Sequence, residues 1–257
     1  MKSITFVVPL SIALLAGTVS PIAYAACSAR SAANHPHLVE LYTTTGCSSC
    51  PPAEKWMSSL LGKADLVGLA FHVDYWDTSE WNDPFDSHDY TERQIALANR
   101  TKSKQYYTPQ IWLDGRLWHD WPKGAPPAPY AGPSPTLRLE VRKDGAALHA
   151  AIEVANATQD ADALRAYVAV SENGLSQYVK GGENKGRTLP QNQVVRALAG
   201  PLSLPKASTD LKLPSGVDLA RSSVVAFLQN NRNGDVVQVV RMPLKECSFV
   251  QAAKAGR

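Results

Sequence analysis

The feature of this sequence that most constrains its fold is a C-x-x-C motif, Cys47 to Cys50, set between a short apolar run and a helical pattern. The apolar run, residues 38–42, predicts a strand, and a polar turn follows it. After the motif, apolar side chains recur at helical spacing between residues 56 and 61. A helix that begins here places N–H groups and the positive end of its dipole beside the first cysteine, where they stabilise a thiolate. The motif therefore predicts a redox-active cysteine pair.

The other two cysteines lie at opposite ends of the chain, at Cys27 and Cys247. A zinc site at the motif would need two more ligands, and these two do not form a second C-x-x-C pair. In an oxidising compartment Cys47 and Cys50 pair with each other, which leaves Cys27 and Cys247 to form a second, structural disulfide. The sequence thus predicts two disulfides and no metal site.

Residues 107–113, which include Thr108 and Pro109, have a strand pattern, and Asp114-Gly115 then predicts a hairpin turn. A cis proline at Pro109 would lie beside the cysteine pair and offer backbone groups to a bound peptide. This arrangement is typical of a thioredoxin-like site. We expect Thr108 and Pro109 to bind substrate.

The first 25 residues have the pattern of a secretory signal peptide. Lys2 is followed by an apolar stretch at 4–16 and by Ala23-Tyr24-Ala25, which fits a cleavage site before Ala26. A lipoprotein signal is the alternative, but Tyr24 stands where a lipid-attachment box has Leu. The apolar stretch is shorter than the ~20 residues of a membrane span. We predict a periplasmic or secreted protein with no membrane span in the mature chain.

The composition of the sequence changes at residues 122–135. These fourteen positions hold six prolines and two glycines, which predicts a linker. Strand and helix patterns alternate before it, and period-two strand patterns follow it. The predicted fold is an α/β thioredoxin-like domain followed by a mostly-β, sandwich-like domain. The predicted divisions are a signal peptide (1–25), the thioredoxin-like domain (26–121), the linker (122–135), the sandwich-like domain (136–250) and a C-terminal tail (251–257).

His72 and Asp74 lie two residues apart at the end of a second apolar run, so they point to the same face. Asp74 is a candidate to give or take a proton as the disulfide opens, or else it caps the following loop. His72 is a core histidine or, less favoured, a copper ligand. The carboxylates spaced by three between 74 and 92 are interpreted as a solvated loop, and the alternative is a calcium or copper site that includes His72 or His88. The net charge of +3 comes without a Lys/Arg run, which excludes an electrostatic case for nucleic acid.

Several segments together carry a resemblance to a known family. They include the Gly46-Cys47-Ser48-Ser49-Cys50-Pro51-Pro52-Ala53 motif with the strand before it, and residues 71–77, 107–110, 182–189 and 194–196. In these segments the chain resembles a family of bacterial secreted thioredoxin-like proteins of unknown function. The resemblance implies a thioredoxin-like domain followed by a β domain, and it implies no substrate.

The function predicted from these features is that of an exported thiol–disulfide oxidoreductase. Cys47, which we expect at the exposed outer tip of the turn, would attack, and Cys50, beneath it, would resolve the mixed disulfide. No cofactor would be needed. Its partners would be a protein or small-molecule thiol or disulfide and a separate redox partner. One alternative is a non-enzymatic binding module with a static disulfide, and another is a copper delivery protein that uses the same thiols with His72. An accessible, acidic Cys47 favours the enzyme, and a buried, inert disulfide favours the binding module.

Overall fold

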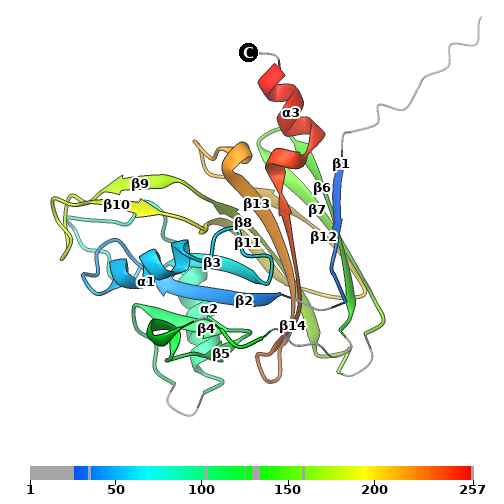
Figure 1. The fold of residues 1–257 in the computed structure, drawn as a ribbon, viewed down its shortest axis with the longest axis horizontal. Helices are drawn as coiled ribbons and strands as arrows, with labels where there is room; N and C mark the ends of the chain where they lie inside the picture. The colour runs from blue at the N-terminus through cyan, green and yellow to red at the C-terminus, as the bar shows by residue number, and fades with distance from the viewer. Residues whose placement is uncertain are drawn as a thin grey trace, which may run out of the picture.

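The structure is a computed structural model that describes residues 26–33, 36–101, 104–124, 126–128, 134–157 and 160–255, with side chains up to residue 251. The predicted signal peptide and part of the predicted linker lie outside the described residues. Figure 1 shows two sheets that face each other, with a two-stranded hairpin extending from one side.

The larger sheet has eight strands in the order β14-β13-β8-β11-β3-β2-β4-β5. Its bounds are β2 (His37–Thr43), β3 (Leu66–His72), β4 (Gln110–Leu113), β5 (Arg116–Leu117), β8 (Leu164–Glu172), β11 (Val194–Leu202), β13 (Ser222–Asn230) and β14 (Val236–Pro243). Strands β2 and β3 are parallel, and β4 is antiparallel to β2. Both β2 and β3 are buried along their whole length, as a near-continuous apolar run predicts for parallel strands.

The smaller sheet has four strands in the order β1-β6-β7-β12. Its bounds are β1 (Ala26–Arg30), β6 (Thr136–Asp144), β7 (Ala147–Ala155) and β12 (Lys206–Lys212), and the separate hairpin is β9 (Leu175–Tyr178) with β10 (Thr188–Gln191). Every second residue of β6 is buried, at Leu137, Leu139 and Val141, so one face of this sheet packs on the larger sheet and the other faces solvent.

The helices are short. They are α1 (Cys50–Ser58), α2 (His88–Ala98) and α3 (Ser248–Ala255), with single 3-10 turns at η1 (Trp121–Lys123), η2 (Leu219–Arg221) and η3 (Leu244–Glu246). Helix α1 begins at Cys50, with Pro51 and Pro52 in its first turn. Proline is tolerated there because the N–H that it lacks would have no partner inside the helix.

The predicted fold class is wrong. The described part of the chain is mostly β, and the strands of the expected α/β domain do not form a unit of their own. Instead β3 pairs on one side with β2 and on the other with β11, where Val194 lies opposite Ala70, so one continuous sheet joins the two halves of the sequence. A buried apolar strand needs a partner on both edges, and β11 supplies the second one.

The β4–β5 hairpin turns through Asp114 and Gly115, as the sequence predicts. Gly115 has φ +79°, and a Cβ on it would lie 1.8 Å from the carbonyl oxygen of Gly234. The turn therefore needs glycine both for its backbone conformation and for the close approach of the β13–β14 turn.

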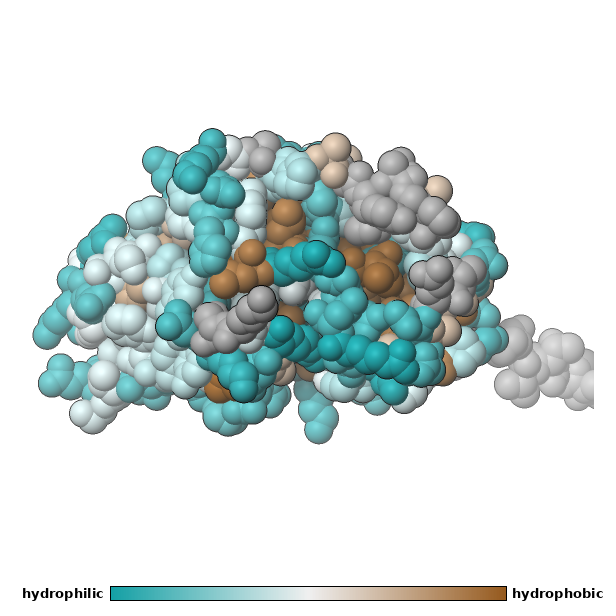
Figure 2. Space-filling model, turned by 90° about the horizontal axis from the view of Figure 1, so that it is seen from below, coloured by the Kyte–Doolittle hydropathy of each residue, from teal (hydrophilic) through white to brown (hydrophobic). Residues whose placement is uncertain are grey.

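Figure 2 shows a mostly polar surface on the face seen from below, with small apolar areas separated by polar side chains. Among the described residues, no helix is both long and apolar enough to cross a membrane.

Candidate functional site

The two cysteines of the motif form a disulfide between the end of β2 and the start of α1. Both side chains are fully buried, so the prediction that Cys47 stands at the exposed tip of the turn is wrong. Ser48 and Ser49 form the exposed tip instead. The Ser49 hydroxyl lies 3.2 Å from the Cys47 sulfur, and the Thr108 carbonyl oxygen lies 3.9 Å from it. The sulfur is thus covered by polar groups.

Residues 180–187, which lie in the connection between β9 and β10 and are called the cover loop here, lie against the motif. The buried Asn184 side chain donates hydrogen bonds to the carbonyl oxygens of Thr45 (3.0 Å) and Cys47 (2.7 Å). The Glu183 carboxylate accepts from both the backbone N–H and the hydroxyl of Ser48, each at 2.8 Å, and these bonds lower its pKa. The backbone N–H of Glu183 donates to the carbonyl oxygen of Gly46. The cover loop therefore fixes the conformation of the motif.

The closest approach between the two loops is at Gly46 and Gly182. Gly182 has φ +69°, and a Cβ on it would lie 3.1 Å from both the Cα and the carbonyl oxygen of Gly46. A side chain at Gly182 would therefore push the cover loop away from the motif.

The hairpin that carries the cover loop is held on both sides of it. Val179 and Leu189 pack with Trp81 in a small apolar cluster. Just after β10, the buried Gln193 side chain donates to the Met57 carbonyl oxygen in α1. The cover loop is thus placed by a hairpin from the second half of the sequence.

A buried ion pair lies behind the motif. Asp83 Oδ2 accepts from His72 Nδ1 (2.8 Å) and from the backbone N–H of Thr45 (2.6 Å), and neither His72 nor Asp83 has an exposed side chain. Burial acts to lower the pKa of His72, but the charge and the hydrogen bond of Asp83 outweigh it, so the pKa is raised. Burial acts to raise the pKa of Asp83, but His72 and two backbone N–H donors hold it well below its usual value.

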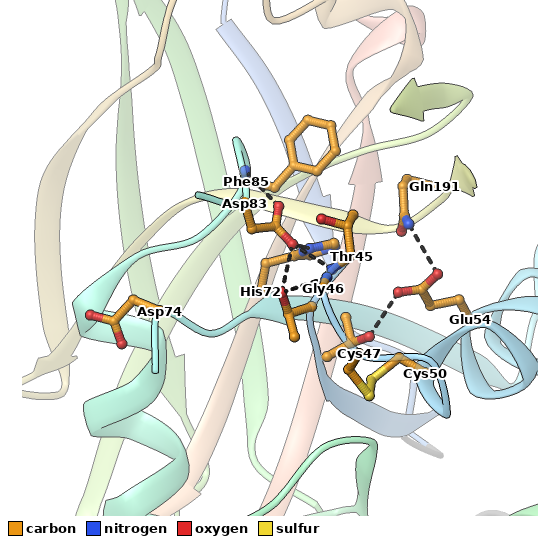
Figure 3. Close-up of polar contacts among 12 residues, drawn as sticks. Thr45, Gly46, Cys47, Cys50, Glu54, His72, Asp74, Asp83, Phe85 and Gln191 are labelled. Carbon is orange, nitrogen blue, oxygen red and sulfur yellow. Dashed lines mark hydrogen bonds and ion pairs between the residues drawn. A yellow bond between two sulfur atoms is a disulfide. The ribbon is translucent and has the colours of Figure 1, made fainter. Parts of the chain in front are cut away.

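Glu54 is a third buried ionisable group. It lies one helical turn after Cys50, accepts from the Thr43 hydroxyl (2.7 Å) and from Gln191 (3.0 Å), and its pKa is raised by burial while the charge of His72 acts against the shift. Figure 3 shows Glu54 and His72 in the same region as the disulfide, and the charge of His72 acts on Glu54. His72 Nε2 has no hydrogen-bond partner among the described residues. Glu54 and His72 are therefore buried groups close to the motif that can hold a proton.

The structure brings some of the predicted site residues together and leaves one apart. The Thr108–Pro109 peptide bond is cis, as predicted, and Thr108 lies against Cys47. Asp74 points away from the disulfide (Figure 3), towards α2, where it pairs with His88 Nδ1 (2.9 Å) and accepts from the Thr91 hydroxyl (2.5 Å). The geometry gives Asp74 the alternative role, that of fixing the loop before α2.

Sequence reasoning missed four residues that shape this site, namely Glu54, Asp83, Glu183 and Asn184. Glu54 carried a usable signal, because a residue four positions after Cys50 lies on the same face of a helix. Asp83 was interpreted as part of a solvated loop, and it is 3% exposed. No local pattern links Glu183 and Asn184 to a motif more than 130 residues earlier.

Among the residues that the structure describes, no group of three or more His, Cys, Asp or Glu side chains is placed to hold a metal ion. His72, the candidate copper ligand, already pairs with Asp83. The geometry therefore offers no support for the copper delivery alternative.

Fold and site together define a β-rich protein with two disulfides, in which one cysteine pair opens a helix beneath a loop from the other half of the chain. Residues 38–229 match the family described as protein of unknown function DUF1223, and the chain belongs to this family. A crystal structure of an Agrobacterium tumefaciens protein from a structural genomics consortium is similar, with a TM-score of 0.56 and 22% identity over 82% of this chain and 96% of that one. This likeness shows the fold alone. No curated protein matches the chain.

Proposed function

We propose that this protein is an exported thiol–disulfide oxidoreductase with the Cys47–Cys50 disulfide as its redox centre. The observation that carries the proposal is the polar, ionisable surroundings of this one disulfide, where Ser49 and Thr108 lie on the sulfur and Glu54 lies one turn away. A disulfide with a purely structural role needs none of these groups. Helix α1 also has no acidic residue in its first turn, so its positive end is free to stabilise a thiolate. The presence of two disulfides supports export to an oxidising compartment.

The chemistry starts from the disulfide form. A substrate thiolate attacks the Cys47 sulfur, a mixed disulfide forms, and Cys50 leaves as a thiolate that takes a proton from the buried network around Glu54 and His72. A second substrate thiolate then attacks the substrate sulfur of the mixed disulfide and releases Cys47. The substrate dithiol has lost two electrons and two protons and has become a disulfide, and Cys47 and Cys50 have become thiols. In the reverse direction Cys47 attacks and Cys50 resolves.

Substrate reaches Cys47 when the cover loop moves. Because Glu183 holds Ser48 through two hydrogen bonds, Glu183→Gln, which removes the charge, should weaken this contact and speed reduction of Cys47–Cys50 by dithiothreitol several-fold. Glu246→Gln is the matched control, an exposed glutamate in η3 that has no contact with the motif. Alkylation followed by peptide mapping reads the state of each cysteine pair. Equal rates in the two variants would show that the cover loop does not control access.

The second candidate function is a binding module with a static disulfide. The full burial of Cys47 and Cys50 favours it. The two functions differ in one measurement on the native protein. The oxidoreductase exchanges Cys47–Cys50 with a dithiol while the rest of the structure stays folded, and the binding module loses this disulfide only when it unfolds. Near-ultraviolet circular dichroism recorded during the reduction distinguishes the two.

A further inference from the structure

Three exposed tyrosines lie together beside the cysteine pair, and Tyr75, Tyr106 and Tyr107 are called the tyrosine surface here. Their exposed fractions are 39%, 47% and 39%, and they are three of the five large hydrophobic side chains that are exposed in the described part of the chain. The rings of Tyr75 and Tyr106 are in edge contact, with centroids 5.6 Å apart. Exposed tyrosines present a large apolar area with a polar tip, which suits them to binding surfaces.

Two buried amides hold this surface in place. The Gln94 side chain in α2 donates to the Tyr107 carbonyl oxygen and to Gln110, each at 2.8 Å, and accepts from the Tyr75 hydroxyl. Gln110 in turn donates to the Gln105 carbonyl oxygen (3.1 Å). Partial burial raises the pKa of Tyr75 to about 12, so its hydroxyl stays protonated at neutral pH. The loop that carries Tyr106 and Tyr107 is thus fixed in advance, which lowers the entropy cost of binding.

The tyrosine surface leads directly to the redox centre. Tyr107 precedes Thr108, whose carbonyl oxygen lies on the Cys47 sulfur. The carbonyl oxygen of Tyr107 accepts a hydrogen bond from the Gln94 side chain. The backbone N–H groups of Tyr106 and Tyr107 have no hydrogen-bond partner among the described residues. An extended peptide can pair with such groups, as in strand addition.

The cover loop, which contacts the motif at Thr45, Cys47 and Ser48, is cationic. The cover loop carries the exposed side chains of Lys180, Lys185 and Arg187, and none of the three forms an ion pair with a described residue. Its acidic residue, Glu183, stays negatively charged while bonded to Ser48, so the three cations and this one carboxylate leave the cover loop with a net charge of +2. A segment that crosses the motif would therefore meet aromatic rings on one side and positive charge on the other.

We propose that the substrate is an extended polypeptide segment with an aromatic or apolar side chain on one side of its cysteine and acidic side chains on the other. This inference rests on the proposed oxidoreductase function and names its substrate class. A small thiol fills only the space at Cys47 and gains nothing from the tyrosine surface. An unfolded chain spans both sides of the motif.

The test measures the rate at which the intact disulfide protein oxidises three dithiols. These are dithiothreitol, a short synthetic two-cysteine peptide flanked by phenylalanine and glutamate, and the same peptide with lysine in place of glutamate. The double variant Tyr106→Ala/Tyr107→Ala is compared with Tyr178→Ala, a more exposed tyrosine on β9 outside the surface, and with Tyr106→Phe/Tyr107→Phe, which keeps both rings. Near-ultraviolet circular dichroism confirms that each variant is folded.

We expect the double alanine variant to oxidise the glutamate peptide about tenfold more slowly while its rate with dithiothreitol is unchanged, since an aromatic anchor acts only on a bound chain. The phenylalanine variant and Tyr178→Ala should behave like wild type. Wild type should prefer the glutamate peptide to the lysine peptide, and added salt should reduce this preference.

Suppose that wild type and the double alanine variant oxidise the peptide at equal rates and both still oxidise dithiothreitol. This result would contradict the role of the tyrosine surface in substrate binding, and the proposed oxidoreductase function would remain. A wild type that oxidises neither dithiothreitol nor peptide would overturn the oxidoreductase. In that case the affinity for the peptide with alkylated cysteines, measured by calorimetry, still tests whether the tyrosine surface binds peptide. Equal affinity for wild type and the double alanine variant would contradict this binding role.

Discussion

The two disulfides of this protein are both shielded from solvent in large part, yet they lie in opposite kinds of surroundings. Cys27 in β1 is joined to Cys247, which is fully buried in the apolar cluster between the two sheets. Cys47 and Cys50 are just as buried, but the Ser49 hydroxyl and the Thr108 carbonyl oxygen lie on the Cys47 sulfur, and Glu54 lies one helical turn after Cys50. Burial therefore does not separate a structural disulfide from an exchangeable one in this chain, and the chemistry of the neighbours does.

The difference matters because the free energy of forming a thiolate depends on the groups around the sulfur. Exchange passes through thiolate anions, and an apolar environment raises the pKa of a thiol. Around Cys247 a thiolate would find apolar side chains. Around Cys47 it would find the start of α1, the Ser49 hydroxyl and ionisable groups that can supply a proton. We therefore expect Cys27–Cys247 to stabilise the fold and Cys47–Cys50 to exchange.

The largest expected effect is on stability and separates the two bonds directly. Replacing both Cys27 and Cys247 by serine should lower the free energy of unfolding by about 5 kcal/mol, because the cross-link joins residues 220 apart. Replacing Cys47 and Cys50 should cost only about 2 kcal/mol, because they are 3 apart. Urea unfolding curves of the two double variants measure both values. A greater loss for the Cys47/Cys50 variant would contradict the division of roles.

The next effect concerns the buried ion pair behind the exchangeable bond. Asp83→Asn should lower the free energy of unfolding by about 3 kcal/mol, because it leaves the fully buried His72 without its charged partner. His88 and Asp74 form the matched pair on the surface, and Asp74→Asn should cost about 1 kcal/mol or less. Urea unfolding at pH 6 compares the two variants. Equal losses would show that the buried pair does not stabilise the site.

The stability difference between wild type and Asp83→Asn should depend on pH. The lowered pKa of Asp83 adds stability that is present above its ordinary value of 3.8 and is lost as the pH falls through the lower folded value. The raised pKa of His72 adds stability that is present below 6.5 and is lost as the pH rises through the higher folded value. The difference between wild type and Asp83→Asn should therefore be largest between about pH 4 and 6.5.

The sequence predicted the short-range features well, and the structure shows why. The strands at 37–43 and 66–72, the helix after Cys50 and the Asp114-Gly115 turn follow from apolar periodicity and turn chemistry, which act within a few residues. The pairing of Cys27 with Cys247 followed from counting cysteines.

The long-range features could not be predicted in the same way. The pairing of β11 with β3 and the contact of Asn184 with Cys47 join residues more than 120 positions apart, and no local pattern marks either partner. This is why the predicted α/β domain is instead part of one continuous sheet, and why the predicted exposed Cys47 lies beneath a loop from the other half of the chain.

The smallest expected effect lies in the acidic loop near the ion pair. Burial and the neighbouring carboxylates of Asp77 and Asp83 raise the pKa of Asp86 to about 7. The folded protein thus keeps a proton that the unfolded chain releases near pH 4, so wild type loses stability as the pH rises from about 4 to 7. Asp86→Asn should remove this loss and raise the melting temperature at pH 8 by about 2 °C. The gain should vanish at pH 4, and a gain of equal size at both pH values would contradict this assignment.

The most direct test of the account is to measure the reduction potentials of both disulfides in the same sample of native protein. The protein is equilibrated in buffers of graded redox potential, quenched with acid and alkylated, and each cysteine pair is quantified by mass spectrometry. The account predicts that Cys47–Cys50 becomes half reduced above about −270 mV while Cys27–Cys247 stays oxidised to below about −300 mV. Reduction of the two bonds together, or of Cys27–Cys247 first, would contradict the claim that the surroundings make only one of them exchangeable.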